Sequence, residues 1–364
     1  MNHNYLPHHS RLEIEKLAGI FNATTTSYKY YWFLAILKFV RKGRTADIPV
    51  QELVIEMISE IWYPINYYKL SFGKQDQFSK GICLLINELG ISADIGKEEL
   101  IQLLRQSSGS ATIDTLIKNF SRFVPYRFLT PWFSGELRGI KDANKNLILS
   151  KLSSRSSKSP YSIANGKVSL YDEWSGYFLS HLTILESFTY WELINYLQKN
   201  NPNVPGLSEK LFPPQTRKLV NARNYWMQVL EISGDIQCIY SDVVITRNDF
   251  SIDHFLPWSF LVHDQIWNLI PTTRSVNSAK SNSLPDIAYF EPFTRMQYAA
   301  IEVMGKYGNG KGLEDYSMLL KKDLNEIMTM EYADFQTSMS NHFTPLYQIG
   351  TNMGFNANWK FGGK

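Results

Sequence analysis

The sequence predicts a mainly α-helical protein with one small strand–strand–helix unit embedded in it. Apolar residues at helical spacing fill much of the chain before residue 110 and after residue 285. Between these regions, residues 237–254 are rich in β-prone residues, and residues 275–281 suit a short helix. A chain of 364 residues is long enough for two or three domains and a large core.

The first part of the chain, residues 12–110, is expected to be helical. Tyr28–Val40 is too long for a typical strand and is rich in helix formers, which indicates a buried helix. Val50–Ile65 carries an apolar stripe at helical spacing, and Pro49 stands at its start, where a missing N–H costs little. The pattern favours two further helices and then a region of short helices and loops: Phe78–Leu89, Lys97–Gln106 and 111–140.

A change of composition follows at residues 141–160, where lysines and an arginine stand among serines. Such a segment favours a solvated linker between domains, and the alternative is a loop that contacts phosphates. Residues 161–173 are expected to form a short hairpin that turns at Asn165-Gly166.

The remaining helices are expected on both sides of the β-prone region. Pro214–Ile232 carries Arg217, Lys218 and Arg223, which are candidates for contacts with nucleic-acid phosphates, although a solvated helix face explains them equally well. The other expected helices are Thr183–Lys199, Glu291–Tyr307, Leu313–Met330 and Ala333–Met339.

The composition excludes several classes of protein. Two cysteines, Cys83 and Cys238, give neither a disulfide framework nor a cysteine-rich zinc site. The N-terminal residues lack the apolar core of a signal peptide, and no apolar run is long enough to span a membrane, so the cytoplasm is the default location. The net charge of +3 requires that any phosphate-binding surface come from local clustering.

The segment from residue 238 to residue 285 holds the chemically informative residues. Gln237–Tyr240 and Phe250–His254 are expected to pair as a hairpin, and a looser connection is expected at Pro257–Pro271. A short helix is expected at Ser275–Ser281, capped by Thr273 or by Ser275 itself.

Residues of this segment suit the hydrolysis of a phosphodiester. His254 suits a general base, because an unperturbed imidazole titrates near pH 6.5. Asp253 and Asn277 offer the hard oxygen ligands that Mg²⁺ or Mn²⁺ prefers. On a regular strand Asp253 and His254 would point to opposite faces, so joint action on one phosphate requires the backbone there to leave strand geometry.

Two further residues complete this set. Asn268 follows His254 by fourteen residues, and its amide can tie the connecting loop back to the strand of His254. Lys280 lies one turn after Asn277, where it would reach a phosphate and assist catalysis; its alternative is a solvated lysine.

The segment resembles the HNH (ββα-metal) nuclease superfamily, and most of all the HNH domain of RNA-guided CRISPR effector nucleases. The resemblance implies that His254 is the base, that Asp253 and Asn277 bind the metal, and that Asn268 braces the loop. Many HNH proteins carry two CxxC pairs for structural zinc, whereas only Cys238 stands here, so no structural zinc is expected. The matching residues are Asp253, His254, Pro257, Ser259, Phe260, Asn268, Asn277, Lys280 and Ser281.

The predicted fold class is therefore mainly α with a small embedded ββα-metal (HNH) finger. The expected divisions are an N-terminal helical domain for target or partner recognition, a basic linker or loop, a helical region leading into the nuclease, the finger, and a C-terminal helical region packed on it: 1–140, 141–160, 161–235, 236–290 and 291–364.

The expected function is that of a metal-dependent DNA endonuclease, in a layout that resembles bacterial restriction and phage-defence enzymes. One site cuts one strand, so a homodimer would supply a second cut. Two alternatives stay open: a subunit of a multi-protein defence complex that is inactive alone, with an ATPase, helicase or sensor partner, and an RNA-cleaving toxin. No membrane contact is expected.

Overall fold

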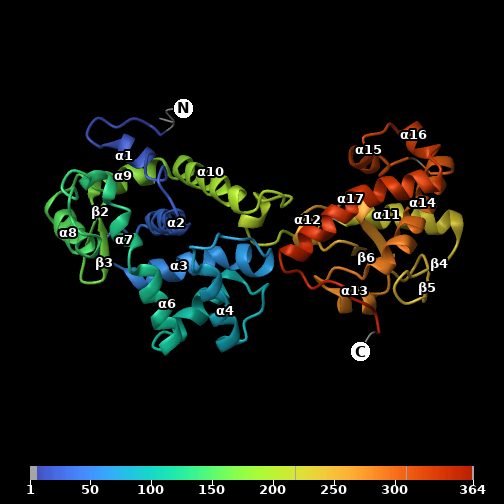
Figure 1. Cartoon of the computed structure of the whole chain (residues 1–364), viewed down its shortest axis with the longest axis horizontal. Helices are drawn as coiled ribbons and strands as arrows, with labels where there is room; N and C mark the ends of the chain where they lie inside the picture. Colours follow the sequence, from blue (N-terminus) through green and yellow to red (C-terminus); the bar gives the residue numbers. More distant parts are fainter. Residues whose placement is uncertain (1–5, 218, 309, 363–364) are drawn as a thin grey trace. The chain divides into compact units, whose positions relative to one another are not determined.

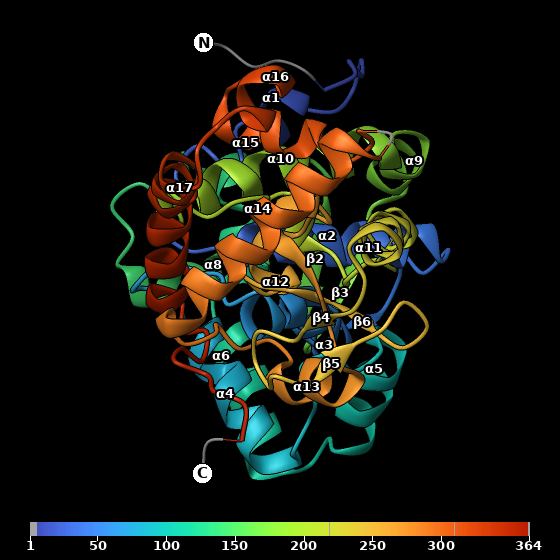
Figure 2. The same ribbon diagram turned by 90° about the vertical axis from the view of Figure 1, so that its right-hand side faces the viewer.

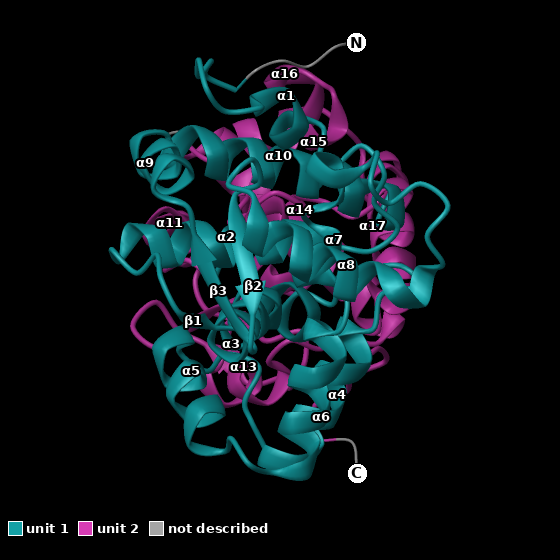
Figure 3. Ribbon diagram, turned by 90° about the vertical axis from the view of Figure 1, so that its left-hand side faces the viewer, with its two compact units in different colours: residues 1–202, 210–213 teal, residues 203–209, 214–364 magenta. Residues whose placement is uncertain are grey.

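The computed structural model describes residues 6–217, 219–308 and 310–362, which divide into two compact units (Figures 1 and 3). Unit 1 comprises Met1–Pro202 and Lys210–Pro213, and unit 2 comprises Asn203–Glu209 and Pro214–Lys364. The chain is mainly helical, with 57% helix and 7% strand, as the sequence predicts. None of the helices in the described ranges is long and apolar enough to cross a membrane.

Unit 1 is built around helix α2 (Tyr28–Arg41), which packs against α3 (Val50–Trp62) and α10 (Leu182–Asn200). Ten of the fourteen residues of α2 are buried, because neighbours cover nearly its whole circumference. The three helices confirm the sequence prediction to within three residues at each end, and α3 continues into a π-helical turn. Further helical elements of unit 1 include α1 (Ile14–Ala18), η1 (Tyr63–Tyr67), α4 (Phe78–Leu89), α5 (Lys97–Gln106), α6 (Ala111–Ser121), α7 (Val124–Arg127), η2 (Thr130–Phe133) and α9 (Asp172–Ser180).

The expected linker at 141–160 is instead largely helix α8 (Asp142–Arg155), which packs on strand β2 (Tyr161–Ala164). The chain passes between the two units within residues 202–214, a segment that contains η3 (Glu209–Leu211). The hairpin at Asn165-Gly166 is confirmed: β2 pairs with β3 (Lys167–Leu170), and both turn residues have positive φ. Strand β1 (Ile48–Pro49) pairs with the other edge of β3.

Unit 2 contains two small antiparallel sheets, and their pairing differs from the expected hairpin. Strand β4 (Ile236–Gln237) pairs with β5 (Val244–Ile245). Strand β6 (Ser251–His254) pairs with β7 (Leu269–Thr272), which lies in the segment expected to be a loose connection. Pro271 is tolerated in β7 because a two-stranded sheet has only edge strands.

Helices of unit 2 pack on the sheet of β6 and β7 (Figure 2). Helix α14 (Phe290–Lys306) packs against α11 (Val220–Ser233) and against α17 (Tyr332–Asn352). Helix α11 begins six residues later than expected, and α17 extends well beyond the expected Met339. The remaining elements are α12 (Trp258–Leu261), η4 (Ile266–Asn268), α13 (Arg274–Lys280), η5 (Ile287–Tyr289), α15 (Glu314–Leu320) and α16 (Leu324–Met328).

The single helix expected at Leu313–Met330 is divided into α15 and α16. Lys321 ends α15 in the left-handed conformation, with φ of 54°. Asp323 and Glu326 then form a capping box that starts α16. The apolar periodicity continues through the break, and for this reason the pattern alone predicts one helix.

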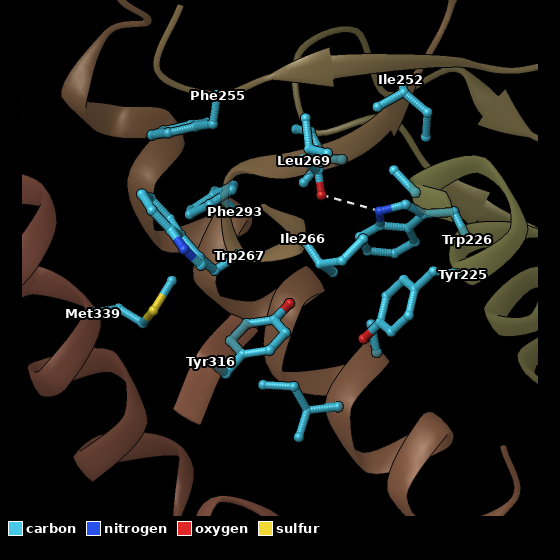
Figure 4. Packing of buried hydrophobic residues seen from close by; sticks show 14 of the residues in the cluster. Tyr225, Trp226, Ile252, Phe255, Ile266, Trp267, Leu269, Phe293, Tyr316 and Met339 are labelled. Atoms are coloured by element: carbon cyan, nitrogen blue, oxygen red, sulfur yellow. Dashed lines mark hydrogen bonds between the residues drawn. The ribbon is translucent and has the colours of Figure 1, made fainter. Parts of the chain in front are cut away.

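The core of unit 2 packs around β7 and η4 (Figure 4). The indole nitrogen of Trp226 donates to the carbonyl oxygen of Leu269 at 3.0 Å. Gln297 is fully buried on α14, and its Nε2 lies 3.0–3.3 Å from the carbonyl oxygens of Ile266, Trp267 and Leu269. One side chain therefore fixes the segment that enters β7.

We predict that Gln297→Leu destabilises unit 2. The substitution removes the donor that these buried carbonyl groups share and the acceptor of the buried Tyr316 hydroxyl, at a cost of about 2–4 kcal/mol in the free energy of unfolding. Urea denaturation measures this loss. The matched variant Gln336→Leu, on the half-exposed face of α17, is expected to change stability by less than about 0.5 kcal/mol. Equal stabilities of the two variants would contradict the bracing role of Gln297.

Candidate active site

Asp253 and His254 are the last two residues of β6, and both keep regular antiparallel pairing. Asp253 lies opposite Ile270, and His254 lies opposite Leu269. The departure from strand geometry that joint action seemed to require is not present. The side chains accordingly have different partners, as alternation along a strand dictates.

The Asp253 carboxylate is bound from two sides. Lys280 Nζ lies 3.1 Å from Oδ1, and the hydroxyl of Tyr240 donates to Oδ2 at 2.9 Å. Lys280 also donates to the carbonyl oxygen of His254 at 2.5 Å. Asp253 is 3% exposed and Lys280 is not exposed at all, so the two charges form a buried ion pair.

This position of Lys280 differs from the sequence expectation. A direct contact with phosphate requires an accessible ammonium, whereas the ammonium here is buried between α13 and β6. Burial lowers the pKa of Lys280, and the neighbouring Asp253 charge opposes that shift. The charge of Lys280 therefore acts on Asp253 and on the end of β6.

His254 is held by Asp264, a residue that the sequence reasoning did not single out. His254 Nε2 lies 2.8 Å from Asp264 Oδ1. Burial lowers the pKa of His254, while the hydrogen bond and the charge of Asp264 raise it. A neutral imidazole that donates from Nε2 to this carboxylate keeps Nδ1 as its basic nitrogen. In the sequence, the contact between these two residues is indicated only by the presence of a carboxylate ten residues after the histidine.

Asn268 ties the loop after β6 to the start of β7. Its Nδ2 donates to the carbonyl oxygen of Leu256, and its Oδ1 accepts from the amide of Leu256, both at 2.9 Å. The backbone carbonyl of Asn268 accepts from Phe255 N at 2.8 Å. The residue is fully buried, so these bonds fix the backbone just beyond His254.

Asn277 lies on α13, one turn before Lys280. Its Nδ2 donates to Ser251 Oγ at 2.8 Å and to the carbonyl oxygen of Ile252 at 3.0 Å. The helix spans Arg274–Lys280, and Thr273 caps it by accepting from Val276 N. Asn277 and Lys280 thus both anchor α13 to β6, and the side chain of Asn277 is partly exposed.

Two of the three basic candidates of the region before the site, Arg217 and Arg223, lie within the described residues. Arg217 is exposed and stands over the ring of Trp258, 5.6 Å from its centroid. Its positive charge also lowers the pKa of His254, which places it on the side of the site. Arg223 donates to the carbonyl oxygen of Phe250 at 3.0 Å. Lys218 lies outside the described residues.

The segment that carries this arrangement is similar to a known family. A family model described as HNH endonuclease matches residues 238–286, which include every residue discussed above except those of α11 and its approach. This match supports a nuclease, a hydrolase of phosphodiester bonds. Comparisons with curated proteins and with solved structures gave no match.

We predict that Lys280→Met destabilises the protein by about 3–5 kcal/mol, because it leaves the buried Asp253 carboxylate without its counter-charge. The double variant Lys280→Met/Asp253→Asn removes both charges and is expected to recover part of the loss. Urea denaturation of the two variants gives the comparison, with Lys322→Met as the surface control. A double variant less stable than Lys280→Met would contradict the pairing.

Proposed function

We propose that this protein is a metal-dependent endonuclease that hydrolyses DNA phosphodiester bonds. The observation that carries the proposal is the hydrogen bond between Asp264 and His254, the last residue of β6, within the segment similar to HNH endonucleases. In this proposal β6, β7 and α13 form the ββα unit, with β7 in place of the first strand that the sequence predicts.

His254 serves as the general base in this proposal. Its depressed pKa keeps the imidazole neutral near pH 7, so Nδ1 can accept a proton from an attacking water. Asp264 accepts a hydrogen bond from Nε2–H, orients the ring and stabilises the imidazolium that forms. Asn268 binds the backbone of Leu256, two residues after His254, and so helps to keep the orientation of the imidazole ring fixed.

The residues present fit a hard divalent cation. The two oxygens of the Asp253 carboxylate offer about four acceptor positions, so Lys280 and Tyr240 leave positions that a cation could use. Asn277, one helical turn before Lys280 on α13, supplies a partly exposed amide. Among the described residues no group of three or more His, Cys, Asp or Glu side chains is placed to hold a metal. A Mg²⁺ or Mn²⁺ ion on Asp253 and Asn277 would take its other oxygens from water and phosphate. A bound ion supplies charge stabilisation at the phosphate.

The substrate and the biological setting follow as proposals. Exposed Arg217 suits contact with a phosphate next to the reacting one, while Arg223 and Lys218 remain candidates for contacts with other phosphates. DNA cleavage in bacterial restriction or anti-phage defence is the setting that we propose, with unit 1 as the part that recognises a target or a partner.

We predict that His254→Ala lowers the rate of plasmid nicking by about 100- to 10,000-fold, because the proton acceptor is lost. The matched control His342→Ala, on the half-exposed face of α17, is expected to cut at the wild-type rate. Circular dichroism and DNA binding confirm that the alanine variant is folded. Wild-type nicking by folded His254→Ala would refute the role of the histidine.

We also predict that EDTA stops nicking and that added Mg²⁺ or Mn²⁺ restores it. Asn277→Ala is expected to raise the Mg²⁺ concentration for half-maximal rate by about tenfold or more, since one ligand is removed. Asn325→Ala, an exposed asparagine on α16, serves as control. Full activity in EDTA would exclude the metal from the reaction.

The same assay separates the alternatives that the sequence leaves open. Nicking of plasmid by the purified protein supports a stand-alone DNA endonuclease. If the protein nicks plasmid only when a second protein is added, the result supports a subunit of a defence complex. Loss of RNA instead of DNA supports an RNA-cleaving enzyme.

A further inference from the structure

Unit 2 contains a cavity of about 430 Å³ next to the candidate active site. Cavities of this size accommodate small organic groups. Three walls form it: one face of α11, the 264–266 segment that precedes β7, and the residues leading into α15 together with Met304 of α14. Asp264 belongs to this cavity and also holds His254, so the cavity and the candidate base share a residue.

The α11 wall presents carboxamides in a row. Asn221, Asn224 and Gln228 recur at intervals of three and four residues, which places them on one helix face. None of the three makes a side-chain hydrogen bond within the described part of the chain, and all are at least partly exposed. Each carboxamide offers two donors and an acceptor to a ligand.

The charge of the lining selects against phosphate. Asp264, Glu314 and Asp315 contribute three carboxylates, against the single ammonium of Lys311. An excess of negative charge disfavours a phosphate group and favours a neutral ligand that carries N–H donors. The apolar part of the lining comes from Tyr225, Ile266 and Met304, among other residues of unit 2.

At Gly312 the backbone passes so close to Tyr225 and Ile266 that no side chain fits at this position. Gly312 has φ of +95°, and a Cβ there would stand 3.1 Å from the ring of Tyr225 and 3.3 Å from Ile266. Only glycine fits this position without strain. The α15 side of the cavity can therefore lie close to α11 and to the 264–266 segment.

We propose that this cavity binds a nucleobase with an exocyclic amino group, turned out of the DNA strand beside the cleaved phosphate. The inference rests on the proposed function, because it takes the ligand from the same DNA. A base combines flat apolar faces with an edge of mixed donors and acceptors, which the apolar lining and the carboxamides match. The carboxylates accept from the amino group, and the phosphates stay outside on the side of Arg217.

Binding without cleavage tests this proposal. The protein is His254→Ala, and the probes are fluorescein-labelled DNA duplexes that are fully paired, or that carry one unpaired adenine or one unpaired thymine. We expect the adenine bulge to bind about tenfold more tightly than the paired duplex, because no free energy is needed to break a base pair at the bulge. The thymine bulge, which lacks an amino group, is expected to show a smaller preference.

Variants of the α11 wall provide the matched comparison. Asn224→Leu/Gln228→Leu in the same His254→Ala protein removes the polar groups and is expected to abolish the preference for the adenine bulge. Asn325→Leu, on α16 away from the cavity, is expected to keep it. An adenine bulge bound no better than the paired duplex, or a preference that survives the double substitution, would overturn the proposal.

Two further measurements separate the possible outcomes. Calorimetry with free deoxyadenosine that shows binding, without any preference for the bulge, would assign the cavity to a free nucleoside and overturn a site for the substrate base. Plasmid nicking by the protein with His254 intact is scored separately. Nicking without bulge preference refutes the base site alone, and bulge preference without nicking refutes the proposed cleavage alone.

Discussion

The buried pair of Lys280 and Asp253 is the constraint on which the candidate site depends. Neither charge is stable in the interior without the other, and Lys280 also binds the carbonyl oxygen of His254. The pair therefore fixes α13 to the end of β6 at the two residues that the chemistry needs. Asn277 adds two hydrogen bonds to the same strand, so the helix has one position on the sheet.

The parts of this structure that the sequence predicts are those with a local signal. Apolar periodicity predicts α2, α4 and α5, and the spacing of Asp253, His254 and Asn277 predicts a nuclease segment. The pairing of β6 with β7 had no such signal, because Pro271 argues against a strand in the sequence, whereas an edge strand accepts it.

Other features could not be predicted from the sequence, for different physical reasons. Helix α8 is rich in serine and lysine and has little amphipathic pattern, so its composition resembles that of a linker. Asp264 and Tyr240 act on the site through contacts that only the folded chain creates. The burial of Lys280 is likewise a result of packing, since the same spacing suits an exposed lysine.

The bracing of the 266–269 segment by Gln297 depends on a residue that the ribosome adds later than the segment itself. Residues 238–286 emerge before α14, yet Gln297, the side chain that donates to the carbonyl groups of Ile266, Trp267 and Leu269, lies on α14. Asp315, later still, accepts from the amide of Ile266. A chain that stops short of these helices holds the residues of the candidate site without two of the contacts that fix the backbone at 266–269. We therefore expect the candidate site to form only after α14 and α15 have been synthesised.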